Sequence, residues 1–355
     1  MSNLKATLNA IKPLDKKMME RAAKKHDSLT KPPGSLGVLE AQGIRLAAIQ
    51  ETLTPRLSGK TAVVFAADHG ITDEGVSAYP KVVTQQMVLN FLKGGAAINA
   101  LCKTHATNLY VADMGVAAEF PDHPYLLKHK LGLGSANMLT MPALTSKQVQ
   151  QALDVGIDLA HRFSEAGSNC LIGGDMGIGN TTSATLLTAV FTSAPVDKVT
   201  GRGTGLDDRG LERKTEVIKK VLAKHQPNPT EPLEVLALIG GLEIAALTGF
   251  YLGAAAKRCA IILDGFIVTA AVLVAHALKP EVSDYMFASH ASQEPGHRLQ
   301  LETLGLSPLF DFGMRLGEGT GAVIASSILD SACAVLSDMA SFAEAGVSGK
   351  DETLD

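Results

Sequence analysis

The stretch TAVVFAADHG, residues 61–70, decides the fold. Its apolar, β-branched run ends in Asp68 and His69, which is the pattern of a buried parallel strand that carries polar side chains at its carboxyl end. Longer helical patterns separate this run from others like it. The alternation predicts an α/β fold with helices on both faces of a parallel sheet and ligands at the carboxyl ends of the strands. The similar runs lie at residues 108–115, 169–177, 259–265 and 284–290.

Helical patterns flank this α/β region. Two short helices are expected within residues 3–26 and a third at residues 36–53, and apolar residues at helical spacing predict that a further helix begins at Thr320 or Gly321. We therefore expect a small helical domain formed from both chain termini, beside a large α/β domain that carries most of the functional site. The expected boundaries are residues 1–57 and 322–355 for the small domain and 58–321 for the large one.

Composition favours a small-molecule ligand. The 355 residues are 46% apolar and 19% charged, with a formal net charge of -4 and no Trp. Such a chain can bury a sizeable core, but it has neither the basic stripe nor the aromatic platform that is typical of nucleic-acid binding. We therefore expect no nucleic-acid partner.

Export and membrane insertion are not expected either. The N-terminal residues 1–21 carry charges throughout and lack the apolar core of a signal peptide. The most apolar run, from Ile261, is interrupted by Asp264 and His276 and falls short of the roughly 20 apolar residues of a membrane span. The four cysteines lack CxxC spacing, which is typical of buried free thiols and favours the cytoplasm. They are Cys102, Cys170, Cys259 and Cys333.

The stretch MRLGEGTG, residues 314–321, contains the strongest candidate for a catalytic base. Glu318 lies between glycines just before the predicted final helix. Glycines allow positive φ angles and close approach to a ligand, and the unpaired N–H groups of a first helical turn can face an anion. The alternative is that Glu318 only complements the helix dipole.

A second glycine-rich stretch, CLIGGDMGIGNTT at residues 170–182, has the composition of an anion site. We expect a strand, a turn and a helix start whose N–H and hydroxyl groups can bind a phosphate. The stretch matches neither GxxxxGK followed by Ser or Thr nor GxGxxG, and an ordinary turn between strand and helix is the alternative. The candidate residues are Gly173, Gly174, Gly177, Gly179, Asn180, Thr181 and Thr182.

A third glycine loop, VTGRGTG at residues 199–205, precedes a helix that carries Lys214. Gly203 and the nearby basic residues can form a second anion cradle. The alternative is an ordinary helix capped by Asp207 or Asp208.

The stretch ADHGITDEG, residues 67–75, places four potential metal ligands close together. Magnesium can be held by carboxylates together with a phosphate, but no second His-rich cluster completes such a site, and we expect no metal. Ligand shaping or a hydrogen-bonded strand end is favoured instead. The four side chains are Asp68, His69, Asp73 and Glu74.

Four motifs in this order resemble one known family over nearly the whole chain. They are KPPGSLG at 31–37, ADHGITDEGVSAYPK at 67–81, GIGNTT at 177–182 and MRLGEGTG at 314–321. The family is nicotinate-nucleotide:dimethylbenzimidazole phosphoribosyltransferase, which makes α-ribazole phosphate for the lower ligand of cobamides.

The resemblance implies a homodimer whose large domain has a Rossmann-like parallel sheet. It also implies that β-nicotinate mononucleotide and 5,6-dimethylbenzimidazole react, with inversion at C1′, to give α-ribazole 5′-phosphate and nicotinate without a cofactor. Glu318 matches the family's catalytic base, and Asp175 and Lys214 match two further active-site positions. Asp175 departs from the family pattern, which usually has Glu, so its shorter side chain puts that residue's role in doubt.

The resemblance also distributes the binding roles. Tyr79, Met87 and Met176 match positions that line the base pocket, an apolar lining that can admit related benzimidazoles or phenolic bases. The remaining expectations rest on position and charge. The phosphate is expected at Gly177, Gly179, Asn180, Thr181, Thr182 and Gly203, and the nicotinate carboxylate at Arg315, Leu316 and Gly317.

Two questions stay open at this point. A helix N-terminus lowers the pKa of Glu318 whereas an apolar base covering it raises that pKa, and the sequence does not rank the two effects. The alternative functions are a metal-assisted phosphohydrolase, built on the four side chains at 68–74, and a nucleotide-binding protein without turnover.

Overall fold

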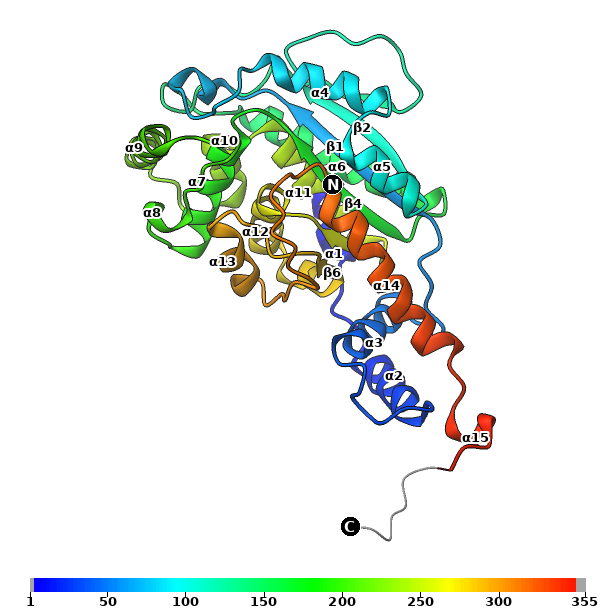
Figure 1. Ribbon diagram of the computed structural model, residues 1–355. Helices are drawn as coiled ribbons and strands as arrows, with labels where there is room; N and C mark the ends of the chain where they lie inside the picture. The colour runs from blue at the N-terminus through cyan, green and yellow to red at the C-terminus, as the bar shows by residue number, and fades with distance from the viewer. Residues whose placement is uncertain (1–2, 349–355) are drawn as a thin grey trace. The chain divides into compact units, whose positions relative to one another are not determined.

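A six-stranded, all-parallel sheet forms the centre of the large unit (Figure 1). The computed structural model describes residues 3–348. The strand order is β3-β2-β1-β4-β5-β6, the Rossmann order, with β1 and β4 on either side of the point where the chain changes direction. The strands are β1 (Lys60–Ala67), β2 (Thr107–Gly115), β3 (Leu126–Lys128), β4 (Cys170–Met176), β5 (Ala260–Leu263) and β6 (Met286–Ala288).

The predicted α/β fold is confirmed, and all five predicted strands are present. β3 was missed because it is only three residues long, too short for any periodic pattern. Strand β1 pairs along nearly its whole length with β2 on one side and with β4 on the other. Its continuous burial explains why its sequence reads as an unbroken apolar run.

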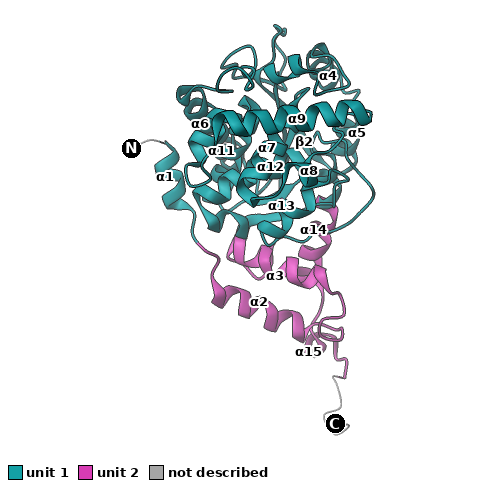
Figure 2. Cartoon of the chain, turned by 90° about the vertical axis from the view of Figure 1, so that its left-hand side faces the viewer, with its two compact units in different colours: residues 1–12, 59–325 teal, residues 13–58, 326–355 magenta. Residues whose placement is uncertain are grey.

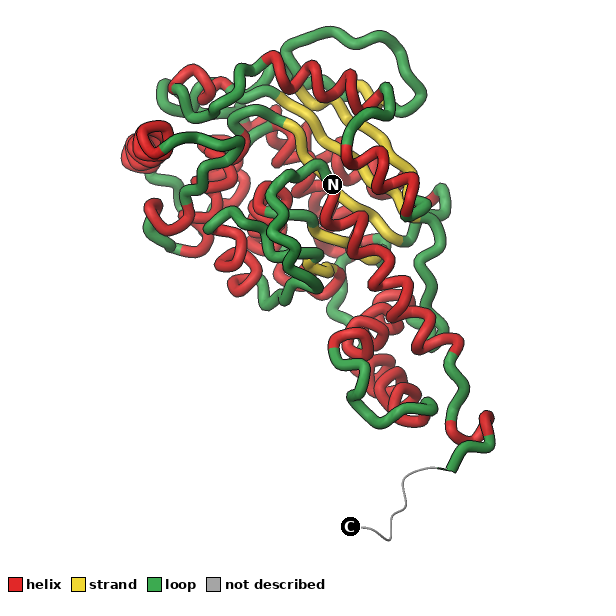
Figure 3. Tube along the Cα trace, viewed as in Figure 1, coloured by secondary structure: helices red, strands yellow, loops and turns green. Residues whose placement is uncertain are grey.

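Helices cover both faces of the sheet (Figures 1 and 3). On one face lie α4 (Val82–Leu92) and α5 (Ala97–Thr104), and on the other lie α11 (Leu242–Ala256) and α12 (Phe266–Leu278), with α6 (Ser146–Glu165) packed against α11. α11 is apolar on all sides and is buried along nearly its whole length because sheet and helices surround it. α6 is amphipathic and begins with a capping box of Thr145 and Gln148.

The other helical elements connect these layers or precede and follow them. They are α1 (Asn3–Ala10), α2 (Lys16–Ser28), α3 (Val38–Gln50), η1 (Gly70–Glu74), α7 (Asn180–Thr192), α8 (Val196–Val199), α9 (Asp208–His225), α10 (Pro232–Ile239), η2 (Pro280–Tyr285), α13 (Gly296–Thr303), α14 (Thr320–Asp338) and α15 (Phe342–Ala345). The final long helix begins at Thr320, as predicted.

The chain divides into two compact units, Met1–Lys12 with Gly59–Ala325 and Pro13–Ser58 with Ser326–Asp355 (Figure 2). This division differs from the expected boundaries at both ends of the chain, since α1 and residues 322–325 group with the large unit. Asn3 Nδ2 donates to Asp158 Oδ1 at 2.8 Å, and the Lys12 carbonyl accepts from the Tyr285 hydroxyl at 2.7 Å. The expected small domain also included residues 1–2 and 349–355, which lie outside the described residues.

The small unit has its own apolar core. Ala22 of α2, Ala47 of α3 and Leu336 of α14 pack together. Near the start of α3, the carboxylate of Glu40 forms an ion pair with Lys31 Nζ at 2.7 Å and accepts a hydrogen bond from the Leu36 N–H at 3.0 Å. This buried ion pair holds the KPPGSLG loop in one conformation.

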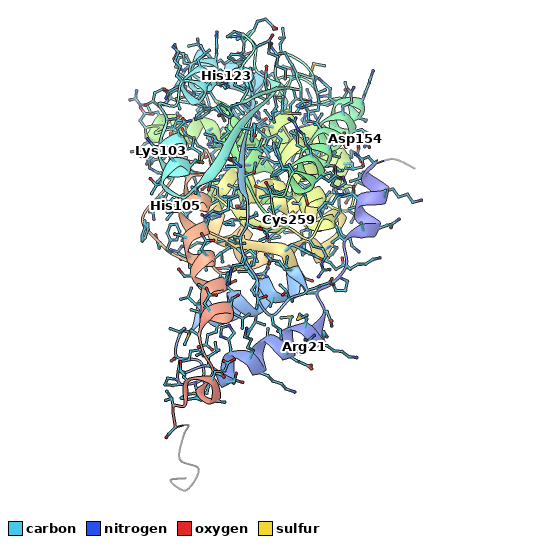
Figure 4. All side chains as sticks on the ribbon, turned by 90° about the vertical axis from the view of Figure 1, so that its right-hand side faces the viewer. Arg21, Lys103, His105, His123, Asp154 and Cys259 are labelled. Carbon is cyan, nitrogen blue, oxygen red and sulfur yellow. The ribbon has the colours of Figure 1, made fainter. Side chains whose placement is uncertain are left out.

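Two sequence expectations about the environment of the chain can be compared with the structure. All four cysteines are free and buried, and Figure 4 labels Cys259 within the large unit. In the described part of the chain, one helix, α14, is long and apolar enough to cross a membrane by length and composition alone, but 56% of its apolar window is buried inside the structure. A buried core helix passes the same test, so this is weak evidence for a span.

The contact between α6 and α11 yields a stability prediction. A Cβ at Gly156 would lie 2.0 Å from the Ala246 carbonyl oxygen and 2.5 Å from the Phe250 nitrogen, so even Ala forces the two helices apart. Gly156→Ala is expected to lower the free energy of unfolding by about 1–3 kcal/mol, measured by urea denaturation. Gln151→Ala, on the exposed side of α6, should stay within about 0.5 kcal/mol of wild type. Equal or higher stability of Gly156→Ala would contradict this packing.

Candidate active site

Polar side chains gather at the carboxyl ends of the central strands. β1 ends before Asp68 and His69, β4 carries Asp175, and β5 ends before Asp264. All four side chains are buried. This is the edge at which doubly wound α/β sheets bind ligands, and the loop before α14 returns to it.

Strand β4 has glycine on both faces, and protein occupies the space on each. A Cβ at Gly173 would lie 2.4 Å from the hydroxyl oxygen of Tyr251 on α11, and one at Gly174 would lie 2.3 Å from the carbonyl oxygen of Glu318. Successive residues of a strand point to opposite faces, so the two glycines admit α11 and the Glu318 loop separately. The expectation that these two glycines approach a ligand was wrong, because protein occupies both faces.

The Glu318 loop has an unusual backbone conformation. Gly317, Glu318 and Gly319 have φ angles of 87°, 64° and 92°. Positive φ is strained for a residue with a Cβ, and such strain persists only where surrounding structure enforces it, often at functional sites. The two glycines therefore allow the backbone to place the Glu318 side chain, which is only 5% exposed.

The Glu318 carboxylate is buried and only partly hydrogen-bonded. Burial raises its pKa, and a hydrogen bond from the backbone N–H of Ile98, at the start of α5, opposes that rise. Among the residues that the structure describes, Oε2 of Glu318 has no hydrogen-bond partner. Of these two influences on the pKa, burial by the protein is the larger.

Asp264 caps the N-terminus of α14. Its Oδ2 accepts from the Gly319 N–H at 2.9 Å, and its Oδ1 accepts from the N–H groups of Gly321 at 2.7 Å and Ala322 at 3.3 Å. Asp264 therefore occupies the N–H groups of this first turn that were expected to face an anion. Burial raises the pKa of Asp264 to about 7, against the effect of the three N–H groups.

Asp175 connects the two glycine-rich segments. Asn180 Nδ2 donates to Asp175 Oδ2 at 2.9 Å, and a Cβ at Gly317 would lie 3.3 Å from Asp175 Oδ1. Burial raises the pKa of Asp175 to about 8, and the negative charges of Asp264, Glu243 and Glu318 add to the rise. Asp175 is therefore mostly protonated near neutral pH and can donate a hydrogen bond.

The turn after β4 leads into α7, whose N-terminus has no side-chain cap. Gly179 precedes this helix with a φ of 97°, which suits glycine. Gly177 packs so closely that a Cβ would lie 2.5 Å from the Ala67 carbonyl oxygen. By contrast, α9 is capped by Asp207, which accepts from the Gly210 N–H at 2.8 Å. Of these two helices, only α7 lacks a side-chain cap, and its Asn180 and Thr182 N–H groups donate to the carbonyl oxygens of Gly177 and Gly179 at 3.0 Å.

The side chain of Lys214, from α9, contacts the start of α7. Its Nζ donates to Thr181 Oγ1 at 2.7 Å and to the Gly201 carbonyl oxygen at 3.2 Å. A Cβ at Gly203 would lie 2.9 Å from Thr181 Oγ1, so the third glycine loop reaches the same point. Burial lowers the pKa of Lys214 to about 8, and the nearby negative charge of Glu294 opposes that change. A buried cation, a hydroxyl and a helix N-terminus therefore lie together, an arrangement of groups that can bind an anion and is called the anion cradle below.

A buried pair of His69 and Glu243 packs against the turn that leads into the cradle. His69 Nε2 and Glu243 Oε1 are 2.5 Å apart, and neither side chain is exposed. A Cβ at Gly177 would lie 3.2 Å from Glu243 Oε1 and 3.3 Å from His69 Cδ2. The pair therefore fixes the first glycine of the turn, and His69 is not available to a ligand.

The four candidate metal ligands at residues 68–74 do not converge. Asp68 accepts from the Ala117 N–H at 2.8 Å, Asp73 pairs with Lys81 at 2.6 Å, and Glu74 accepts from Asn137 at 2.6 Å. His69 is committed to Glu243. Within residues 3–348, no group of three or more His, Cys, Asp and Glu side chains is placed to hold a metal ion.

The residues expected to bind the base lie around the same edge. The Ile178 N–H donates to Thr84 Oγ1 of α4 at 3.1 Å, and Met87 lies one turn further on the same face of α4. The side chains of Met87 and Met176 are both half-buried. Tyr79 lies apart from them, 53% exposed, in a loop whose Ala78 N–H donates to Thr204 at 3.3 Å.

Arg315 and Leu316 lie at the rim. Both side chains are exposed, and Arg315 has no ion-pair partner among the described residues. A separate cleft of ≈ 670 Å³, lined in part by Leu133, Met141 and Leu238, contains none of the predicted site residues.

Three residues of the site were not predicted. Asp264 and Glu243 are acidic side chains inside strongly apolar segments, which is the signal that could have indicated them, because a buried charge needs a structural or functional partner. Ile98 contributes only its backbone N–H, for which no sequence signal exists.

The fold and the site together define an α/β protein with an anion cradle beside a buried carboxylate, the equipment of an enzyme that acts on a small phosphorylated ligand. A family model described as phosphoribosyltransferase matches residues 11–347, and the chain belongs to this family.

Relatives that carry the name of one enzyme are similar to nearly the whole chain. The nicotinate-nucleotide–dimethylbenzimidazole phosphoribosyltransferase of Roseiflexus sp. (strain RS-1) is 51% identical over 352 residues, which are 99% of this chain and 100% of the relative. The enzyme of that name from Geobacter sulfurreducens is 46% identical over 351 residues, with 99% and 100% covered. The crystal structure of the enzyme from Thermus thermophilus has a TM-score of 0.91 at 47% identity and covers 95% of this chain and 100% of that one.

The buried cation predicts a pH-dependent stability. The pKa of Lys214 is about 8 when folded and 10.5 as a free side chain, so between these values the unfolded state binds more protons and stability rises with pH, by up to about 1.4 kcal/mol per unit. In Lys214→Met this contribution is lost, so its free energy of unfolding relative to wild type should fall as pH rises from 8 to 10. Urea unfolding across this range measures the difference.

A matched control for this measurement is Lys220→Met, an exposed position on the same helix. It should keep the pH slope of the wild type. A slope for Lys214→Met equal to that of wild type would contradict the low pKa of Lys214.

Proposed function

We propose that this protein transfers the 5-phosphoribosyl group of nicotinate mononucleotide to 5,6-dimethylbenzimidazole or a related base, giving α-ribazole 5′-phosphate and nicotinate for cobamide assembly. The observation that carries the assignment of the base is the buried Glu318 carboxylate, whose Oε2 has no partner among residues 3–348. A buried acceptor without a donor is costly, and a benzimidazole N–H would provide that donor.

The chemistry needs few groups. A benzimidazole nitrogen attacks C1′ from the face opposite nicotinate, and the C1′–N bond breaks with its electron pair moving to the pyridine nitrogen. The cationic pyridinium thereby becomes a neutral ring, so the leaving group needs no acid. The second benzimidazole nitrogen loses its proton to Glu318. The raised pKa of Glu318 makes it a stronger base than an exposed glutamate, provided that it is ionised.

The phosphate belongs in the cradle at the start of α7. Gly177, Gly179 and Gly203 bring backbone close to it, Asn180, Thr181 and Thr182 begin the helix, and Lys214 supplies the charge. Asp175, mostly protonated, lies between the cradle and Glu318 and can donate to the ribose or to nicotinate. The shorter side chain of Asp175, compared with the usual Glu, is held by Asn180. This contact gives Asp175 a defined position despite its length.

The base lies against Met87 and Met176, since flat apolar ligands suit thioether walls, whereas Tyr79 lies apart from these two side chains and is exposed. Arg315, with the Leu316–Gly317 backbone, binds the nicotinate carboxylate. We further propose that the enzyme is a homodimer and acts in the cytoplasm, which the buried free cysteines favour.

A metal-assisted phosphohydrolase is not favoured. Its proposed ligands Asp68, His69, Asp73 and Glu74 each bond to a different protein group. Assembling them around one ion would require breaking the buried His69–Glu243 pair.

Glu318→Gln tests the proposed base. The amide has the same shape but cannot accept a proton, so kcat with dimethylbenzimidazole should fall by about 100-fold to 10,000-fold. Product formation is measured by chromatography in the presence of a chelator, and binding of nicotinate mononucleotide by calorimetry. Binding should be retained. The exposed Glu302→Gln is the matched control, and near-normal turnover by Glu318→Gln would remove Glu318 as the base.

The cradle predicts an alkaline loss of affinity. Lys214 is charged below a pKa of about 8 and neutral above it, so kcat/KM for nicotinate mononucleotide should decline above pH 8, approaching about tenfold per unit. Lys214→Met should have a low kcat/KM that does not change between pH 7 and 9. If instead Asp175→Asn removes the decline and Lys214→Met retains it, the titrating group is Asp175.

A further inference from the structure

The acceptor that fixes the Glu318 loop has no role in the chemistry described above. Asp264 lies at the end of β5, 1% exposed, and both of its carboxylate oxygens accept hydrogen bonds from the backbone of the loop and of α14. We propose that Asp264 is a positioning residue for the reaction, because it holds residues 317–322 in the conformation that aims Glu318. The inference rests on the proposed role of Glu318 as base.

The hydrogen bonds around the loop form one connected set. Asp264 binds the N–H groups of Gly319, Gly321 and Ala322. The N–H and the hydroxyl of the intervening Thr320 both donate to the Gly317 carbonyl oxygen, at 3.1 Å and 2.8 Å. Every N–H from 319 to 322 therefore has a partner, and these partners fix the chain immediately after Glu318.

The backbone at residues 318–319 is held between Asp264 and strand β4. The Glu318 carbonyl oxygen rests against Gly174, and the Gly319 N–H points to Asp264. Glu318 is held at a positive φ of 64°, which an isolated chain would seldom adopt. Without the Asp264 bonds, the loop can relax to ordinary φ angles, and the Glu318 carboxylate would leave its place beside Ile98.

A carboxylate is required at position 264 because three backbone N–H groups donate hydrogen bonds to this one side chain. Asn has a single acceptor oxygen, and its NH₂ group would face one of the backbone N–H groups. The carboxylate of Asp264 does not reach a substrate, since its oxygens are buried and bonded to protein. It therefore acts through Glu318 and not on the reacting atoms.

Asp264→Asn is the central test. Loss of one or more loop bonds should misplace Glu318 and lower kcat by about 10-fold to 100-fold, the effect of an ångström-scale error, while KM for nicotinate mononucleotide changes little. The double variant Asp264→Asn/Glu318→Gln should be no slower than Glu318→Gln alone. Amide hydrogen exchange should be faster in peptides covering residues 317–322 and unchanged in those covering α9.

Asp264→Asn could fail to fold because residue 264 is buried, so a second variant tests the same loop without changing Asp264. A Cβ at Gly319 would meet only ordinary contacts of 3.5 Å or more, but its φ of 92° disfavours any L residue. Gly319→Ala should therefore disturb the loop without a clash and reproduce the loss of kcat. Gly305→Ala, at a φ of 66° with nothing within 4 Å, is the matched control and should retain wild-type kcat.

The outcomes separate the two proposals. Wild-type kcat and exchange in Asp264→Asn would overturn the inference, and so would fully additive losses in the double variant. If Glu318→Gln itself retains turnover, the proposed base fails, and hydrogen exchange of residues 317–322 alone then decides whether Asp264 holds the loop.

Discussion

The contact between the backbone of Glu318 and the Cα of Gly174 is the constraint on which the site depends. It requires glycine at this position of β4, because a Cβ would lie 2.3 Å from the Glu318 carbonyl oxygen. It also requires positive φ at residues 317–319, since the chain must turn sharply between the sheet and α14. The side chain of Glu318 is consequently buried next to the strand that also carries Asp175. One tight packing contact thus fixes the position, the burial and the neighbours of the proposed base.

The carboxyl groups of Asp175, Asp264 and Glu318 are buried close together at this edge and cannot all be charged in a low-dielectric interior. Asp264 has three backbone N–H donors to stabilise its charge, whereas Asp175 has one amide donor and the higher pKa, about 8 against about 7. A proton is therefore best held by Asp175. Glu318 then has two carboxyl neighbours: Asp175, which is neutral, and Asp264, whose charge is stabilised by three backbone N–H groups. In this arrangement a buried glutamate can stay ionised and act as a base.

Local pattern was sufficient for the fold but only partly for the site. The parallel strands were predictable because each is an apolar run between helical patterns, and β3 was not because three residues carry no period. Glu318 and Lys214 were indicated by glycine loops and by the family resemblance. Asp264 was not, since the groups it binds lie 55 to 58 residues further along the chain. Burial of a single Asp in an apolar strand indicates that it has partners, but does not say which.

Because partners distant in sequence cannot be read from local pattern, the first turns of α7 and α14 were both expected to face an anion, although the two differ in the structure. Both α7 and α14 begin after glycines with positive φ, and either could have faced an anion by sequence alone. The difference is a side chain from another strand: Asp264 occupies the donors of α14, while no side chain caps α7. An anion bound at α14 would have to displace a buried carboxylate, whereas one at α7 meets Lys214. The phosphate and the base are thereby assigned to different helix starts, and Asp175 stands between them.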